Sequence, residues 1–81
     1  MRIDDFLSSV GVIKRRTIAK QLGSTGMIAV NGNTVKPSYQ VKLKDIIHIK
    51  GTRSSVIEVL DIPTGSVSKE KRELYFSEIE S

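Results

Sequence analysis

The chain has 81 residues, of which 38% are hydrophobic, contains no cysteine, and carries a formal net charge of +4. This length allows one domain of modest stability, held by its apolar core without disulfides or thiolate metal sites, which suits the cytosol. The sequence contains neither a signal-peptide pattern nor an apolar run of the roughly 20 residues that a membrane span needs, so we expect a soluble, cytoplasmic protein with no membrane partner.

The charges are segregated along the chain. Residues 1–53 contain ten Lys or Arg against three Asp, whereas residues 54–81 contain three Lys or Arg against six acidic residues. Such an asymmetry is typical of nucleic-acid-binding proteins, although proteins with other functions can be basic too. The sequence therefore favours a polyanionic partner for the first part of the chain.

The first predicted element is a short helix at the start of the chain. Its apolar residues recur at the spacing of one helix face: Ile3, Phe6, Leu7 and Val10. Asp4 and Asp5 lie in its first turn, where the helix dipole favours anions. Gly11 is expected to end it.

A second helix is predicted from Lys14 to Leu22, with Ile18, Ala19 and Leu22 facing inward. The stretch GSTG, residues 23–26, supplies the glycine that ends this helix. We expect the two helices to pack on each other.

Strands are predicted for the middle of the chain. Residues 27–30 lead into Asn31, Gly32 and Asn33, which favour a tight reversal. Residues 45–50 and 55–62 follow as two strands joined across Gly51 to Ser54. The polar connection after Pro63 contains one helical turn at residues 69–72, and residues 74–79 fit either a strand or a helix end. The order predicts an α+β fold with a small, mostly antiparallel sheet.

The inventory of side chains argues against catalysis and against a metal site. His48 is the only histidine and lies in an alternating strand, where a surface or boundary position is the usual outcome. Asp4 and Asp5 are helical neighbours that point about 100° apart, so they do not form a catalytic carboxylate pair. The GSTG stretch lacks the lysine of a phosphate-binding loop and precedes a strand. We expect no enzymatic activity, no metal and no cofactor.

The basic residues of the second helix are the candidate binding surface. Arg16 and Lys20 are four residues apart and share a helix face, with Arg15 beside them and Ile18 and Leu22 opposite. An ordinary solvated helix face is the alternative reading. No Asp or Glu occurs between Lys14 and Asp45, however, and a merely soluble surface mixes both signs. Uncompensated cations of this kind imply an external anion.

Arginine suits phosphate because its planar fork of donors can bind two oxygens at once, and such contacts give affinity with little sequence reading. Folded RNA is recognised largely by shape, phosphate and 2′-hydroxyl contacts. The chain has few aromatic residues for stacking single-stranded bases; we expect Phe6 to be in the core and Tyr39 to pack, although Tyr39 could also stack. Folded RNA is the favoured ligand.

Five segments in order carry a family resemblance: RIDDFL, KRRTIAKQL, GMIAVNG, KPSYQV and DII, which together cover residues 1 to about 50. The sequence resembles the RNA-binding module named after ribosomal small-subunit protein four, the S4 domain. The resemblance implies two N-terminal helices packed against a small bent sheet. We expect this domain to span residues 1–62, followed by a C-terminal extension, residues 63–81, that packs on or flanks the sheet.

The short tail is similar to that of the stand-alone bacterial S4 proteins of ribosome-associated quality control and their heat-shock relatives, and lacks the longer basic tail of the latter. This resemblance implies a monomer that binds the large ribosomal subunit through large-subunit rRNA and peptidyl-tRNA. It also implies a partner elongation factor that adds a C-terminal alanine tail to stalled nascent chains.

The resemblance implies RNA-binding roles for six residues: Arg2, Arg15, Arg16, Thr17, Lys20 and Lys36. Thr17 would contact either phosphate or the backbone at the helix start. Asp4 would orient a neighbouring arginine or cap the first helix. Asp5 departs from the family pattern, which commonly has Lys there, so one cationic contact is lost. Asn31 and Gly32 match the family's turn and serve its backbone geometry.

Three alternatives remain open from the sequence. An S4 protein could act in ribosome assembly or in regulating an RNA. The acidic tail, Glu70 to Glu80, could instead make the chain a protein-interaction adaptor. A fragment of a pseudouridine synthase or a tRNA synthetase would need further downstream sequence, and the Met1 start and short tail favour a complete small protein.

Overall fold

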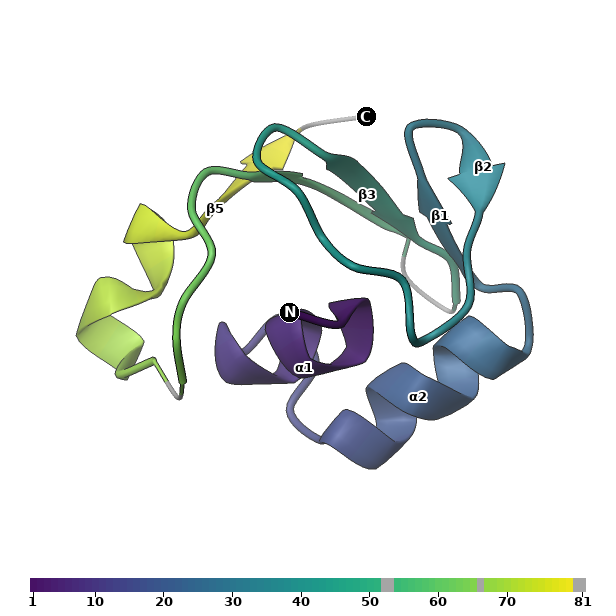
Figure 1. Ribbon diagram of the computed structural model, residues 1–81, viewed down its shortest axis with the longest axis horizontal. Coiled ribbons are helices and arrows are strands. Elements are labelled where there is room, and N and C mark those ends of the chain that lie inside the picture. Colours follow the sequence, from purple (N-terminus) through teal and green to yellow (C-terminus); the bar gives the residue numbers. More distant parts are fainter. Residues whose placement is uncertain (52–53, 66, 80–81) are drawn as a thin grey trace.

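Two helices lie beneath a curved five-stranded sheet in the computed structural model, which describes residues 1–51, 54–65 and 67–79 (Figure 1). The elements are α1 Ile3–Ser9, α2 Arg16–Ser24, β1 Ile28–Val30, β2 Asn33–Thr34, β3 Ile46–Ile49, β4 Ser55–Val59, the 3-10 helix η1 Lys69–Leu74, and β5 Phe76–Ile79. Thr52 and Arg53 of the predicted turn, Ser66 of the polar connection and Glu80 of the acidic tail lie outside the described residues. No helix in the described ranges has both the length and the apolar character that crossing a bilayer requires.

The sheet has the strand order β2-β1-β3-β4-β5, and each described pair of neighbours is antiparallel. The predicted α+β class with a small antiparallel sheet is therefore confirmed. The C-terminal stretch that fitted either a strand or a helix end forms β5, which pairs with β4 and places Phe76 opposite Val59. The boundary between a domain of residues 1–62 and an extension remains a prediction.

The core lies between α1 and the concave face of the sheet, which arches over this helix (Figure 1). The four apolar residues predicted for one face of α1 are all fully buried: Ile3, Phe6, Leu7 and Val10. They pack in one cluster with inward residues of three strands: Ile28, Val30, Ile47, Ile49, Ile57 and Val59. Each of these large side chains contributes about 1.5–3 kcal/mol when it leaves water. The apolar stripe thus fixes which face of α1 meets the sheet.

The Asn31-Gly32 turn joins β1 to β2 as the sequence predicts. Asn31 has φ 52° and Gly32 has φ 87°, the pair of positive angles that a type I′ hairpin needs. The Asn31 side chain also works across the sheet, because its amide oxygen accepts the Ile46 backbone N–H at 3.1 Å. Asn31 therefore fixes both the reversal of the chain between β1 and β2 and the distance of this turn from β3.

Helix α2 begins two residues later than predicted. Arg15 is extended, with φ −123° and ψ 133°, because the preceding segment is tied to the end of α1 by the bond from the Ile13 N–H to the Leu7 carbonyl. Arg15 therefore lies ahead of the helix, and the expectation that it occupies a helical face beside Arg16 is wrong. The predicted packing of α1 against α2 is confirmed.

Of the two glycines in the GSTG stretch, only Gly26 ends α2. It has φ +77°, and the Met27 N–H bonds to the Leu22 carbonyl at 2.9 Å, the pattern of a Schellman motif. Gly23 lies inside the helix and is buried; a Cβ there would approach the Pro37 ring to 2.8 Å. Gly23 thus allows α2 to lie directly against the segment after β2.

Asp45 is a buried carboxylate that joins the β1–β2 turn to the connection between β2 and β3. It is 5% exposed and accepts hydrogen bonds from the Tyr39 hydroxyl at 2.9 Å, the Lys42 backbone N–H at 2.9 Å and the Asn31 amide at 3.2 Å. The expectation that Tyr39 packs is confirmed, since its ring lies against the core. Partial burial raises the pKa of Tyr39, and the hydrogen bond to Asp45 and the charge of that carboxylate raise it further.

Asp45→Ala should destabilise the fold by about 2–4 kcal/mol, because three donors lose their acceptor in a largely buried place. Urea unfolding followed by circular dichroism measures this change. Asp61→Ala is the matched control, since Asp61 is exposed and, among the described residues, its carboxylate accepts only the neighbouring Ile62 N–H. Equal effects of the two substitutions would contradict the role given to Asp45.

Tyr39 should make the free energy of unfolding depend on pH in the alkaline range. Its pKa is raised in the folded state, so its stabilising contribution is complete below the ordinary value near 10 and is lost as the pH rises through the folded value. The difference in unfolding free energy between wild type and Tyr39→Phe, about 1 kcal/mol at neutral pH, should therefore shrink above pH 10. A difference that stays constant to higher pH would contradict this assignment.

Candidate RNA-binding surface

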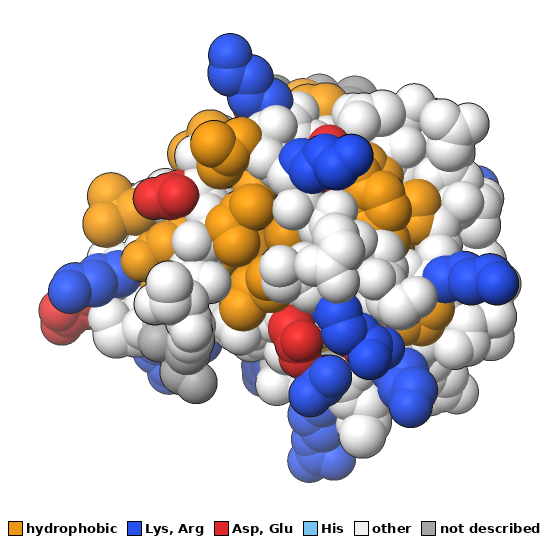
Figure 2. Space-filling model, in the orientation of Figure 1, with side chains coloured by type: hydrophobic (Ala, Val, Ile, Leu, Met, Phe, Trp, Pro, Cys, Tyr) orange, Lys and Arg blue, Asp and Glu red, His pale blue; other side chains and the backbone are white. Residues whose placement is uncertain are grey.

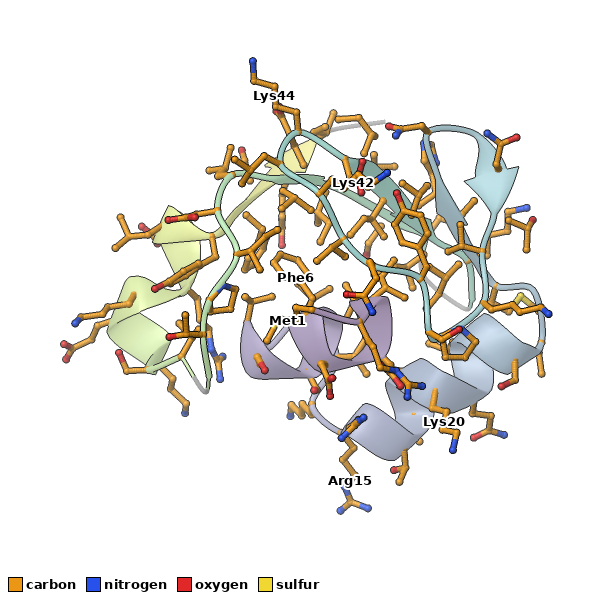
Figure 3. The ribbon with its side chains drawn as sticks, in the orientation of Figure 1. Met1, Phe6, Arg15, Lys20, Lys42 and Lys44 are labelled. Carbon is orange, nitrogen blue, oxygen red and sulfur yellow. The ribbon has the colours of Figure 1, made fainter. Side chains whose placement is uncertain are left out.

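The beginning of α2 presents a group of exposed cations. Lys14 and Arg15 precede the helix, Arg16 opens it, and Lys20 follows one turn later, all with exposed side chains. Arg15 and Lys20 point away from the body of the molecule at its lower edge (Figure 3). Arg16 and Lys20 lie in the same helix four residues apart, so the predicted shared face of these two residues is confirmed.

The backbone at this helix end adds to the positive potential. The first backbone bonds of α2 run to the Arg15 carbonyl from the N–H groups of Ile18 and Ala19, and in the part of the chain that the structure describes no side chain caps this helix start. The N–H groups of Arg16 and Thr17 therefore face outward from the helix start, where the dipole is positive. Two arginines at this end are unfavourable to the isolated helix, whereas they favour an anion bound there.

Arg16 is held by carboxylates of α1. Its Nε forms an ion pair with Asp5 Oδ1 at 2.8 Å and lies 3.9 Å from Asp4 Oδ2. The expectation that the cations of this region are uncompensated is therefore wrong for Arg16, because packing of the helices brings acidic residues from α1 that are distant in sequence. The Arg16 side chain remains 56% exposed. Because Nε contacts Asp5, the terminal nitrogens are the donors left for a ligand.

Asp4 links Arg2 to the same network. Asp4 is fully buried, and its Oδ2 accepts from the Arg2 guanidinium at 3.1 Å, while its Oδ1 accepts the Asp5 backbone N–H at 2.8 Å. Of the two alternatives expected of Asp4, the contact with Arg2 shows the first, orienting an arginine, whereas the N-cap residue of α1 is Arg2 and makes no side-chain cap bond among the described residues. The Arg2 Nε is buried without a hydrogen-bond partner among the described residues. Arg2 and Arg16 thus converge on one pair of carboxylates.

The other two predicted residues lie on α2 and beyond it. Thr17 is exposed in the first turn, and within the described residues its hydroxyl makes no hydrogen bond to the backbone. Lys36 is exposed and precedes Pro37, which packs against Gly23 near the opposite end of α2 from Arg15. The structure therefore brings Arg2 and Arg16 together and places Lys36 about one helix length away.

Figure 2 shows how these charges gather on the surface. Lys and Arg side chains cluster at the lower edge of the molecule, beside an acidic side chain, where α1 and α2 begin. Basic side chains elsewhere on this face are more scattered. We call the set of Arg2, Arg15, Arg16, Thr17, Lys20 and Lys36 the α2 surface, with Lys36 at its far end.

Ile18 belongs to this part of the protein although it was expected in the core. It is 44% exposed, so that expectation is wrong. The inward face of α2 is set by its small residues, Ala19 and Gly23, which are both buried and let the helix approach closely. The spacing of these small residues was the available signal. Ile18 is left as an apolar side chain among the cations.

Comparison with known proteins identifies the family. Residues 1–47 match the model of the S4 domain. The chain is 41% identical over 81 residues to a Helicobacter pylori protein named RQC P-site tRNA stabilizing factor, an alignment that covers 95% of this chain and 94% of the relative. A Bacillus subtilis protein of the same name is 34% identical over 76 residues, covering 93% of this chain and 88% of the relative.

Solved structures agree on the fold. Heat Shock Protein 15 of Vibrio cholerae, whose structure is trimeric, superposes with a TM-score of 0.88 at 22% identity, over 98% of this chain and 81% of that one. The solution structure of a hypothetical protein gives a TM-score of 0.85 at 34% identity, over 100% of this chain and 99% of that one. The chain therefore belongs to the S4 domain family and, within it, to the group of RQC P-site tRNA stabilizing factors.

Proposed function

We propose that this protein binds folded RNA on the large ribosomal subunit, contacts both rRNA and peptidyl-tRNA, and acts in ribosome-associated quality control. The relatives that match nearly the whole chain are named for stabilising P-site tRNA, which supports this assignment. In this role the protein works in the cytoplasm as a binding factor, without catalysis, metal or cofactor of its own.

The observation that carries the proposal is that carboxylates of α1 hold the Arg16 side chain in place. An exposed guanidinium whose Nε already contacts Asp5 has lost much of its rotational freedom before any ligand arrives. Its two terminal nitrogens can bind two phosphate oxygens, and the N–H groups at the start of α2 lie beside them. A merely solvated arginine needs no such positioning.

The remaining cations of the α2 surface would extend the contact along the RNA. Arg15, just before α2, and Lys20, one turn into it, both point away from the body of the molecule, and Arg2 adds donors next to Asp4. Lys36 would contact phosphate at the far end of the helix. Contacts of this kind fix orientation and register, while the shape of the folded RNA supplies the specificity.

The proposed partners follow from this role. They are large-subunit rRNA, peptidyl-tRNA, the large subunit itself, and an elongation factor that adds an alanine tail to the stalled nascent chain. We propose that one copy of the protein suffices on each subunit. An S4 factor in ribosome assembly would use the same surface, and the presence or absence of peptidyl-tRNA on the co-purified subunits separates the two roles.

A protein-interaction adaptor is the second candidate, favoured by a hollow at the C-terminal end. The hollow has a volume of about 430 Å³ and is lined by Leu60, Glu73, Phe76, Ser77 and Glu78. Leu74 nearby is largely exposed. Apolar side chains rimmed by carboxylates would suit a basic, apolar segment of a partner protein. Partners that stay bound after ribonuclease treatment would favour this candidate.

Arg15→Ala/Lys20→Ala should weaken binding to large ribosomal subunits without unfolding the protein, because no ion pair involves either side chain among the described residues. Loss of two phosphate contacts should make the slope of log affinity against log salt shallower by about 1.8 on duplex-like RNA. Sedimentation of the tagged protein with bacterial ribosomes through sucrose gradients at several salt concentrations measures this.

The matched control for this double variant is Lys69→Ala/Lys71→Ala, which removes the same charge from exposed positions in η1. Arg16→Ala should also lower the bound fraction, with a stability change below about 1 kcal/mol because its ion pair is partly exposed. Protein that stays with tRNA-bearing large subunits in all variants would refute the assigned surface.

Asp5→Ala separates two possible roles of Asp5, because they predict opposite changes in the affinity for RNA. If Asp5 is only a negative charge near the RNA, its removal should tighten binding. If Asp5 positions Arg16, its removal should weaken binding, and we expect a loss of about threefold or more at a salt concentration that screens long-range attraction. Affinity for purified large subunits, measured by fluorescence anisotropy of the labelled protein, distinguishes the two, and tighter binding would contradict the positioning role.

A further inference from the structure

A second basic site lies on the turn formed by Lys42, Leu43, Lys44 and Asp45. The Asp45 N–H bonds to the Lys42 carbonyl at 3.2 Å, which closes the turn, and Lys44 has φ 71°. This third position of a four-residue turn with positive φ is one that glycine or asparagine normally fills. Left-handed backbone is disfavoured for a side chain like that of lysine, so the sequence keeps Lys44 where glycine would fit without strain.

The turn is fixed to the body of the protein. The Lys42 N–H donates to the buried Asp45 carboxylate at 2.9 Å, and the Lys44 N–H donates to the Val59 carbonyl at 2.8 Å. The same Asp45 carboxylate is held by Tyr39 and Asn31. These hydrogen bonds fix the backbone from which the two lysine side chains project. They also keep Lys44 in its strained left-handed conformation.

Both lysine side chains are free to meet a ligand. They are exposed, and in the described ranges neither ammonium lies within ion-pair distance of a carboxylate. Leu43 between them is 59% exposed. Figure 3 shows Lys44 projecting from the upper edge of the molecule and Lys42 below it in the upper half, whereas Arg15 and Lys20 lie at the lower edge. An RNA helix that lies along the α2 surface therefore leaves this turn uncovered.

We propose that the turn Lys42–Lys44 is a separate RNA-backbone site, so that one molecule of the protein holds two RNA segments on opposite sides. This inference rests on the proposed RNA-binding function and adds a second contact to it. The overall extents of 29 × 26 × 23 Å make the protein a short, rigid spacer between the two segments. The lysines contact phosphates, and Leu43 lies against the sugar-phosphate surface between them.

The test uses two copies of one RNA hairpin, one biotinylated and immobilised, the other fluorescent and in solution. Wild-type protein captured by the first hairpin should recruit the second. Lys42→Ala/Lys44→Gly should still be captured through the α2 surface but recruit the second hairpin roughly tenfold less, as expected for two lost phosphate contacts. Lys69→Ala/Lys71→Ala is the control for loss of the same charge.

Replacing Lys44 with glycine separates an effect on RNA binding from an effect on folding. Lys44→Gly removes a side chain from a left-handed position, so the melting temperature of the double variant should not fall below that of wild type. Recruitment by the double variant equal to that of the control would overturn the second site, including the case in which the turn docks a protein. Failure of wild-type protein to be captured by the first hairpin, or by large subunits, would instead overturn the RNA-binding function itself.

Discussion

A carboxylate that is fully buried must be paired, and Asp4 meets this requirement by binding Arg2 and by lying close to Arg16. Since Arg2 precedes α1 and Arg16 opens α2, one buried charge ties the beginnings of the two helices together. The apolar stripe of α1 places that carboxylate, because the same helix turn that buries Ile3 and Phe6 also buries Asp4. Core packing therefore determines where the arginines of the α2 surface can lie.

Asp45 repeats this arrangement on the other side of the fold. It too is a buried carboxylate, and its partners are neutral donors: one from the β1–β2 turn and two from the connection between β2 and β3. In a chain whose first 53 residues are strongly basic, the few acidic residues are used internally. Two of the three are buried and the other contacts Arg16, so these acids position parts of the basic surface and neutralise part of its charge.

Local patterns were sufficient for most of the elements and for much of the core, but not for β5 or for the first residue of α2. The stripe of α1 and the Asn31-Gly32 turn depend on neighbouring residues, and both follow directly from the sequence. The ion pair between Asp5 and Arg16 could not be predicted, because it depends on how two helices pack. Ile18 was predicted to be buried but is exposed, for the same reason. Periodicity marks Ile18 as an apolar residue of the helix, but the close approach of α2 to the protein that Ala19 allows decides which face of the helix is buried.

The sheet ends at β5, whose outer edge is unpaired within the described residues. An open edge is a template for pairing with another copy of the chain, and proteins guard such edges with short strands and charged side chains. Here β5 has four residues, with exposed Ser77 and Glu78. A short strand with an exposed carboxylate at Glu78 therefore has two of the features that disfavour pairing with the edge of another copy.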